Sequence, residues 1–374
     1  MRKILLLLFA LLSITIGAQE VVNAVHDSFR PGKLWFDTDG RLINAHGGGI
    51  LYHGGRYWWY GEHKGEASVN ALVGVTCYSS VDLYNWKYEG VALPVSNNPQ
   101  SPIVKDCILE RPKVVYNAKT GKFVMYFHLE LKGQGYAAAN VGVAVSDTPT
   151  GPFRFLKNSR VNPGKAPLGT KPKTLQKAFK DKYAQEWWTP QWSEDIKNGL
   201  FTARDMEGGQ MSRDMTLFVD DDGTAYHIYA SEDNLTLQIA ELTPDYLDHT
   251  GRYIRIDAGG SNEAPAIFKK DGRYYMITSG CTGWDPNAAR LLTADSIMGA
   301  WTRHANPCRG DGAEKTFQSQ STYILPVQGK KDMYIFLADQ WRPANPIDSR
   351  YVWLPIEFED GLPVIKWKNS WKIE

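Results

Sequence analysis

The fold is decided by a stretch that the chain repeats with variation, and its first copy, residues 45–62, reads AHGGGILYHGGRYWWYGE. A short motif with a polar residue opens it, a run of strand-forming residues and a Gly-Gly turn follow, and an aromatic run closes it. Two weaker runs come next, at residues 73–78 and 86–88. Aromatic and β-branched residues bounded by glycine turns are typical of short β-strands. The stretch therefore predicts a unit of four short strands.

Four further copies follow along the chain. Their openings are Glu110-Arg111-Pro112, Ser212-Arg213-Asp214, Asn262-Glu263-Ala264-Pro265 and Gln318-Ser319-Gln320-Ser321. Most openings lie roughly 50 to 65 residues apart, which is the length that four short strands and their turns need. Five openings predict an all-β fold, a five-bladed β-propeller. A two-sheet sandwich is the alternative, but it leaves the recurring openings unexplained.

The step between the second and third openings is too long by about one blade. Either a sixth blade or an insertion would fill it. Residues 162–210 lack strand alternation and carry Leu175, Phe179, Tyr183 and Trp187 at steps of four, which is the stripe of an amphipathic helix. We therefore predict five blades with a partly helical insertion around residues 162–210.

The first 18 residues have the plan of a secretory signal peptide. Arg2 and Lys3 precede the almost wholly apolar residues 4–16, and Gly17-Ala18 supplies small residues for cleavage. No later segment reaches about 18 consecutive apolar residues, so no membrane insertion is expected. We expect cleavage near Ala18, a periplasmic or secreted location, and a single propeller domain over residues 19–374.

The composition limits which kinds of binding partner are expected. The chain has 42 Lys and Arg against 41 Asp and Glu, so a nucleic acid held by bulk charge is not an expected partner. Aromatic residues make up 12% of the chain, and their flat faces suit sugar rings. Cys77, Cys107, Cys281 and Cys308 form no CxxC pair and no zinc spacing. We expect most of them to be free and buried, with a Cys281–Cys308 disulfide as the alternative.

The repeats also predict a site. The first strand of each propeller blade lines the central axis, so residues at equivalent positions of the openings converge. The converging set is His46 or Asn44, Glu110, Asp214, Glu263 and Gln320. Taken alone, each acid could equally lie on the surface or in a salt bridge. The motif Glu-x-Pro recurs at two openings, however, which argues for a shared position. Buried carboxyl groups need partners or a function. Carboxyl groups in an aromatic-walled pocket favour glycoside hydrolysis, in which one of them must be protonated.

Other chemistries fit less well, because the chain has no GxSxG, GxGxxG, P-loop or HExxH motif. We predict no metal and no cofactor, leave a calcium ion on the axis open, and expect a monomer.

Motifs along nearly the whole mature chain carry a resemblance to a known family. They lie at residues 45–49, 59–64, 110–114, 212–215, 262–265, 282–284, 319–321 and 351–355. The set resembles glycoside hydrolase family 43, and is most similar to its exo-β-1,3-galactanase branch. The resemblance implies a five-bladed propeller and an inverting hydrolase of plant glycans.

The resemblance also implies catalytic roles. Glu263 matches the catalytic acid. Asp214 matches the residue that, in the broad family, tunes the pKa of the catalytic acid and orients it. In the galactanase branch the residue that matches Glu110 has this role. Most of the family carries a general-base Asp in blade one, but residues 43–47 hold no carboxylate here. The galactanase branch shares this absence.

In that branch a glutamine matching Gln320 handles the water. A neutral amide is a very poor base, so an unusual tautomer or simple water positioning would be needed. Gln318 would face the same side of a strand as Gln320. Glu62, the nearest free carboxylate in blade one, is expected to bind substrate or to be the base.

Further substrate contacts are expected around the mouth of the pocket. The predicted residues are His46, Tyr136, Asn234, Thr282 and Trp284. A Trp face suits the apolar face of galactose, and ordinary packing is the alternative. Trp187, Trp188 and Trp192 of the insertion form either a local mini-core or a wall of the pocket.

We therefore expect a secreted exo-β-1,3-galactosidase whose partner is a galactan or arabinogalactan oligosaccharide. An α-L-arabinofuranosidase or a β-xylosidase is the alternative within the enzyme class, and the missing Asp argues against both. A non-catalytic glycan-binding propeller is the alternative from another class, and the three retained acids argue against it.

Overall fold

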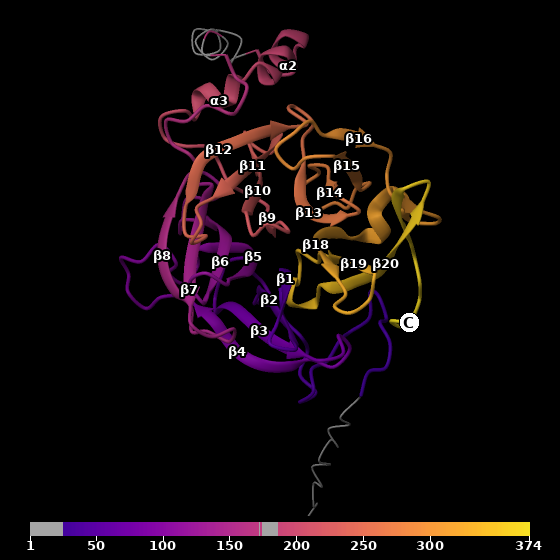
Figure 1. The fold of residues 1–374 in the computed structure, drawn as a ribbon. Helices are drawn as coiled ribbons and strands as arrows, with labels where there is room; N and C mark the ends of the chain where they lie inside the picture. The colour runs from indigo at the N-terminus through magenta and orange to yellow at the C-terminus, as the bar shows by residue number, and fades with distance from the viewer. Residues whose placement is uncertain (1–24, 172, 174–185) are drawn as a thin grey trace, which may run out of the picture.

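The computed structural model describes residues 25–171, 173 and 186–374. Its strands form five sheets arranged as a ring around one axis, so the prediction of an all-β, five-bladed β-propeller is confirmed (Figure 1). The expected signal peptide, residues 1–18, lies outside the described residues. Among the residues that are described, no helix is both long and apolar enough to cross a bilayer.

Each of the first four sheets contains four antiparallel strands in chain order. Blade I comprises β1 (His46–His53), β2 (Arg56–Glu62), β3 (Gly74–Ser80) and β4 (Lys87–Pro94). Blade II comprises β5 (Ile108–Asn117), β6 (Lys122–Glu130), β7 (Asn140–Ser146) and β8 (Arg154–Ser159). Blade III comprises β9 (Met215–Val219), β10 (Ala225–Ser231), β11 (Thr236–Leu242) and β12 (His249–Ile256). Blade IV comprises β13 (Glu263–Lys270), β14 (Arg273–Ser279), β15 (Arg290–Ala294) and β16 (Thr302–His304).

Blade V has five strands, because a short strand joins its outer edge in parallel. It comprises β17 (Cys308–Arg309), β18 (Gln320–Pro326), β19 (Tyr334–Gln340), β20 (Arg350–Glu359) and β21 (Leu362–Lys366), in the order β17-β21-β20-β19-β18. Two 3₁₀ turns, η2 (Ala313–Gln318) and η3 (Pro346–Asp348), complete this blade. The ring closes where Phe29 pairs with Trp371 through two backbone hydrogen bonds of 2.9 and 3.1 Å.

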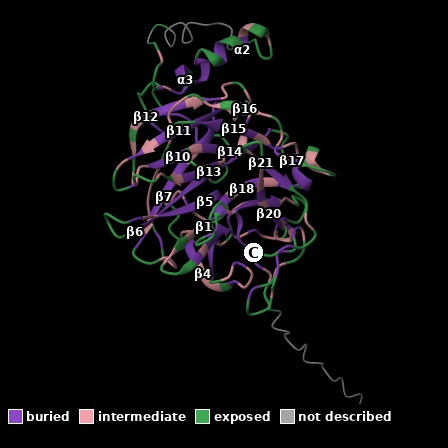
Figure 2. Cartoon of the chain, turned by 45° about the vertical axis from the view of Figure 1, so that its right-hand side comes forward, coloured by how far each residue is buried: buried purple, intermediate pink, exposed green. Residues whose placement is uncertain are grey.

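The hydrophobic core lies between neighbouring blades, and Figure 2 shows the strands as largely buried. Alternate side chains of a strand point to opposite faces of its sheet. On β6, Met125 and Phe127 therefore pack toward blade I, whereas Val124 and Tyr126 pack toward blade III. The strand-forming, aromatic runs of the sequence are thus explained, because both faces of every blade are covered.

The inner strands of three blades share one irregularity. The pairing register slips after His46 in β1, after Glu110 in β5 and after Glu263 in β13. The residue that follows each has a positive φ: 59° at Gly47, 56° at Arg111 and 54° at Ala264. A β-bulge of this kind bends the strand and re-aims its side chains. His46, Glu110 and Glu263 therefore occupy equivalent positions, as the repeats predicted.

The long step in the sequence is an insertion in a five-bladed ring, not a sixth blade. Val161 and Gln210 pair at its neck, and helices α2 (Pro190–Lys197) and α3 (Leu200–Arg204) lie within it. It projects from the rim next to β12 (Figure 1). The helical stripe predicted from Leu175, Phe179 and Tyr183 falls outside the described residues.

The insertion packs a small core of Trp192, Ile196, Leu200 and Phe201 against Leu235 of the turn between β10 and β11. Trp187 and Trp188 contact Trp192 but remain 49% and 76% exposed. Of the two readings of this tryptophan cluster, the structure supports the local mini-core. All four cysteines are free: Cys77, Cys107 and Cys308 are buried and Cys281 is exposed.

Candidate active site

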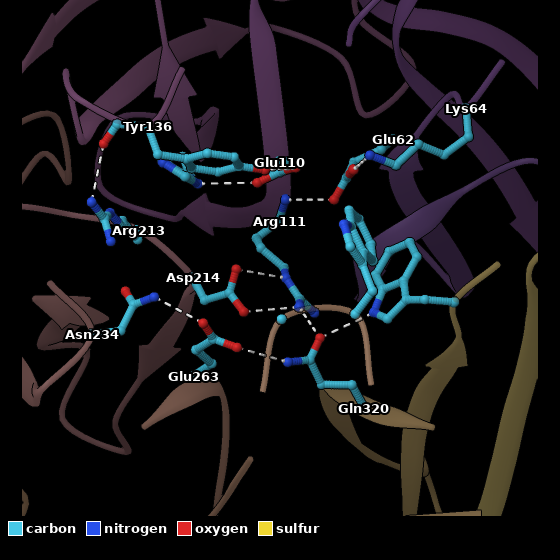
Figure 3. Close-up of a pocket in the computed structure, with 14 residues that line it drawn as sticks. Glu62, Lys64, Glu110, Arg111, Tyr136, Arg213, Asp214, Asn234, Glu263 and Gln320 are labelled. Atoms are coloured by element: carbon cyan, nitrogen blue, oxygen red, sulfur yellow. Dashed lines mark hydrogen bonds and ion pairs between the residues drawn. The ribbon is translucent and has the colours of Figure 1, made fainter. Parts of the chain in front are cut away.

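A cavity of about 330 Å³ lies at the centre of the ring, and residues from all five blades line it (Figure 3). Eight of the predicted site residues line this cavity: Glu62, Glu110, Tyr136, Asp214, Asn234, Glu263, Trp284 and Gln320. The other lining residues are Lys64, Arg111, His128, Arg213, Gly283 and Trp341. Trp187, Trp188 and Trp192 are not among them, so they form no wall of this cavity.

Arg111 lies at the centre of the site and joins three blades (Figure 3). Its guanidinium forms a bidentate ion pair with Asp214, at 3.0 Å from Nε and 2.8 Å from Nη2. Nη2 also donates to Oε1 of Gln320 at 2.6 Å, and Nη1 donates to the carbonyl oxygen of Ser321 at 3.1 Å. Arg111 is buried, and its left-handed backbone at the bulge directs the side chain into the cavity.

Carboxylates of one blade bind the bulge amides of the next. Backbone N–H groups donate from Gly47 to Asp339 at 2.7 Å, from Arg111 to Glu62 at 2.8 Å and from Ala264 to Asp214 at 3.1 Å. Such charge-assisted hydrogen bonds are stronger than neutral ones. The acids of the central site therefore fall into two groups. Asp339, Glu62 and Asp214 hold bulges, whereas Glu110 and Glu263 are carried on them.

Glu263 is the acid whose environment favours the protonated form. Burial, followed by the negative charge of Asp214, raises the pKa of Glu263 to about 7, against the opposing charge of Arg111. Oε1 accepts a hydrogen bond from Nδ2 of Asn234 at 2.8 Å, and Oε2 lies 3.4 Å from Nε2 of Gln320. A substantial share of this carboxyl group is therefore protonated at neutral pH.

Glu110 is held in the opposite state. Burial alone would raise its pKa, but the hydrogen bond from His128 and the charges of Lys64, His128 and Arg111 lower the pKa of Glu110 to about 2. Tyr136 donates to Oε1 at 3.0 Å, and Nδ1 of His128 lies 3.3 Å from Oε2. Glu110 is therefore ionised, and the two bulge glutamates are poised in different protonation states.

His128 is a buried cation. Burial alone would lower its pKa, but hydrogen bonds with Glu110 and Glu130 and the charges of both acids raise the pKa of His128 to about 9. Donor atoms of Glu110, His128 and Asp214 lie within 4.8 Å of one another, which is a spacing that could hold a metal ion. His128 and Arg111 already supply positive charge to these acids, so their negative charge is compensated by the chain itself.

Glu62 forms an ion pair with Lys64, and both are buried. Burial raises the pKa of Glu62, while the charge of Lys64 opposes that rise. The expectation of a free carboxylate in blade one is therefore wrong, because Glu62 is bound by both Lys64 and the backbone of Arg111.

Three predicted residues lie outside the cavity lining. His46 is fully buried and lies against Asp339, with 3.3 Å between Nδ1 and Oδ1, so it has no surface to offer a sugar. Gln318 ends η2, whereas the strand begins at Gln320, so the two glutamines do not share a strand face. Thr282 donates to the carbonyl oxygen of Asp285 at 2.5 Å and supports the loop that carries Trp284.

Sequence reasoning missed five lining side chains: Lys64, Arg111, His128, Arg213 and Trp341. Arg111 and Lys64 lie inside motifs that the sequence analysis used, and the position of Arg111 directly after Glu110 was the available signal. His128 lies opposite Glu110 in the pairing of β5 with β6. Predicting the pairing register of that hairpin would have placed His128 next to Glu110. Nothing in the sequence singled out Trp341, which lies beyond the end of β19.

Comparisons with known proteins agree with this geometry. Residues 185–363 match the family described as glycosyl hydrolases family 43. A family 43 β-1,3-galactosidase solved with galactodeoxynojirimycin is 61% identical, covers 92% of this chain and 100% of its own, and superimposes with a TM-score of 0.89.

Two exo-β-1,3-galactanase structures are also similar. That of Clostridium thermocellum is 36% identical with a TM-score of 0.75, and covers 93% of this chain and 67% of its own. That of Phanerochaete chrysosporium, solved with galactose, is 31% identical with a TM-score of 0.74, and covers 93% and 69%. A curated β-D-galactofuranosidase of Aspergillus niger is 24% identical over 311 residues, 80% of this chain and 73% of that protein.

Proposed function

Because this chain belongs to family 43 of the glycoside hydrolases, within its exo-β-1,3-galactanase branch, we propose that it is an inverting exo-β-1,3-galactosidase. Its substrates in this proposal are galactan and arabinogalactan-type oligosaccharides, from which it releases galactose. The proposed reaction assigns no role to a metal or a cofactor, and a calcium ion on the axis stays open.

One observation carries the proposal. Glu263 combines a pKa raised to about 7 with a position in a cavity of about 330 Å³ that all five blades line. General acid catalysis is most effective when the pKa of the acid lies near the working pH. In this proposal Glu263 gives its proton to the glycosidic oxygen as the bond from that oxygen to C1 breaks. Water attacks C1 from the opposite face and releases one of its two protons to solvent, and solvent then returns a proton to Glu263.

Other residues of the cavity prepare this step. Asp214 raises the pKa of Glu263 by its charge, and Arg111 fixes Asp214 in place. We assign the orientation of the water to Gln320, whose side-chain nitrogen lies next to Glu263. We assign sugar contacts to Tyr136, which reaches Glu110, and to Trp284.

The size of the cavity supports an exo mode of attack. A volume of about 330 Å³ is at the low end for small-molecule sites, which suits one terminal sugar better than a long stretch of chain. Trp284 remains 44% exposed beside it and contacts Trp341, with ring centroids 5.9 Å apart. A flat aromatic surface there suits the apolar face of the sugar.

The location is part of the proposal. A signal peptide over residues 1–18 would send the mature domain, residues 19–374, to the periplasm or beyond as a monomer. N-terminal sequencing of the exported protein is expected to begin near Gln19, and an intact Met1 would contradict the export route.

The activity is tested with the purified mature protein on β-1,3-galactan and on 4-nitrophenyl glycosides. The panel contains β-galactopyranoside, β-galactofuranoside, α-L-arabinofuranoside and β-xyloside. We expect galactose release from galactan, and a preference for furanosides or xyloside would overturn the assignment.

Proton NMR of the first-formed galactose tests the stereochemistry. Inverting enzymes keep the acid and the water-handling group roughly 6.5–9.5 Å apart and release the opposite anomer. Nε2 of Gln320 and Oε2 of Glu263 lie 3.4 Å apart in this structure, so in this proposal the sugar must enter between the two side chains and separate them. The α-anomer is expected first, and initial β-galactose would overturn inversion.

A further inference from the structure

The turn between β10 and β11 has an unusual backbone. Glu232, Asp233 and Asn234 are consecutive, none is glycine, and their φ angles are 54°, 56° and 65°. Left-handed conformations are unfavourable for residues with a side chain and normally occur singly. Among the described residues, only one other run of three exists, Thr316–Gln318, and it directly precedes Ser319-Gln320. Such backbone persists only when its surroundings hold it, and it gathers at functional sites.

Glu232 is held by a buried network. Arg255 donates from Nε at 2.6 Å and from Nη2 at 2.7 Å. Thr236 donates to Glu232 at 2.7 Å, and Thr202 donates at 3.0 Å. Thr202 belongs to α3, so the insertion reaches the first residue of the turn.

Asp233 is held from the same helix. Nη1 of Arg204, the last residue of α3, lies 2.6 Å from Oδ2 of Asp233. Nη2 of Arg213 is 3.5 Å from Oδ1. The side chain of Arg204 is 39% exposed and does not line the central cavity, so this contact is separate from the sugar site.

Asn234 connects the left-handed turn to Glu263. Its Nδ2 donates to Oε1 of Glu263 at 2.8 Å, and its carbonyl oxygen accepts from the backbone nitrogen of Asn262 at 2.9 Å. A return of the turn to right-handed backbone would redirect the Asn234 side chain away from Glu263.

We propose that the insertion acts as a clamp on the left-handed turn, so that Arg204 and Asp233 are positioning residues for the proton donor, acting through Asn234. This inference rests on the proposed function, because it requires Glu263 to be the acid. Neither residue lines the central cavity.

The clamp affects Glu263 in two ways. The Asn234 hydrogen bond fixes the direction of the carboxyl group, and small misplacements of a reacting group are costly in rate. The same bond stabilises the carboxylate and lowers the pKa of Glu263, so its loss raises that pKa. The charged and titratable groups that act on Glu263 from the neighbouring elements are Asp214, Arg111, Cys281 and Arg290.

The experiment compares Arg204→Gln with Arg252→Gln in the full-length mature protein. Arg252 forms an exposed ion pair with Glu241 on the outer strands of the same blade, so it is a matched control. For Arg204→Gln we expect kcat on β-1,3-galactan to fall about tenfold, a part of the 10²–10⁴ that acid assistance is typically worth. We expect little loss on a 2,4-dinitrophenyl galactoside, and an alkaline limb of the pH–rate profile that moves to higher pH. Arg204→Lys is expected to restore most of the rate, and Arg252→Gln to behave as wild type.

Asp233→Asn is the second variant, because Asn tolerates left-handed backbone and only the ion pairs with Arg204 and Arg213 are lost. It is expected to show the same leaving-group dependence and the same shift of the alkaline limb. Equal losses on both substrates, or an unmoved limb in both variants, would overturn the clamp. Glu263→Gln separates the two ideas: if it retains normal turnover on galactan, the proposed function itself fails.

Discussion

Arg111 donates a hydrogen bond of 2.6 Å from Nη2 to the side-chain oxygen of Gln320. Nε1 of Trp341 donates to the same oxygen at 3.0 Å. Guanidinium and indole N–H groups cannot accept, so the oxygen of Gln320 must face them. Its NH₂ group is left to donate to Ser279 at 2.9 Å and to face Glu263. In the amide form, Gln320 therefore presents a donor next to the acid, which suits orienting a water more than removing its proton.

Replacing Gln320 is expected to slow every substrate alike. Gln320→Ala removes the group that orients the water, and misplacement of a reactant can cost about 10²-fold in rate. We expect kcat to fall by about that factor on both β-1,3-galactan and an aryl galactoside. Gln328→Ala is the matched control, because Gln328 is exposed beyond the end of β18 and lies outside the central cavity, and steady-state kinetics on both substrates make the comparison. A loss confined to galactan would argue against this role.

Replacing Glu263 is expected to discriminate between leaving groups. Glu263→Gln keeps the shape and removes the proton, and general acid assistance is typically worth about 10²–10⁴-fold. The loss should be large on galactan, whose leaving group is a sugar alkoxide. It should be much smaller on a 2,4-dinitrophenyl galactoside, which needs little protonation. Glu314→Gln, at an exposed glutamate of η2, serves as the control. Near-normal turnover of galactan by Glu263→Gln would place the acid elsewhere.

The pH dependence of kcat/KM is expected to report Glu263 in the free enzyme. The acid works when protonated, so the rate should fall as the pH rises through about 7, the value to which burial and the charge of Asp214 raise the pKa of Glu263. Asp214→Asn removes that negative charge and leaves Arg111 without its partner. Both changes favour the carboxylate, so the alkaline limb should move to lower pH.

Asp222→Asn, at an exposed turn of the same blade, should leave the limb in place. A limb that does not move in Asp214→Asn would show that Asp214 does not tune the acid.

A buried histidine pair is expected to limit stability in mild acid. Nδ1 of His227 lies 3.1 Å from Nε2 of His249, and burial lowers the pKa of both, that of His249 to about 4. The unfolded chain binds these protons near pH 6.5, whereas the folded chain resists them. The pair therefore costs no stability above about pH 6.5, and stability is lost as the pH falls from there toward 4.

Thermal unfolding between pH 7.5 and pH 4.5 measures this effect. His249→Gln removes one of the two buried titrating groups, so its Tm should fall less steeply with pH than that of the wild type. Parallel curves for the two proteins would contradict the linkage.

The sequence by itself determined the repeating part of the molecule. Strand alternation, glycine turns and the recurring openings are local patterns, and each blade buries both of its faces against its neighbours. The equivalence of Glu110 and Glu263 followed from the same repeats, and the shared bulges account for it. The insertion was also visible, because its residues break the period.

Only the tertiary structure decided which polar residues face the cavity. His46 has the same position as Glu110 and Glu263, yet Asp339 of β19 covers it. The prediction for Gln318 was wrong because Gln318 ends η2 and the strand begins only at Gln320, so the alternation of a strand does not set the direction of its side chain.

Arg111 shows the reason most plainly. It stands beside Glu110 in the sequence, but its partners Asp214 and Gln320 are 103 and 209 residues away. The charge state and direction of a buried side chain depend on the groups that surround it in space. In this ring those groups come from other blades, so the repeats could bring the acids together but could not say which of them would hold a proton.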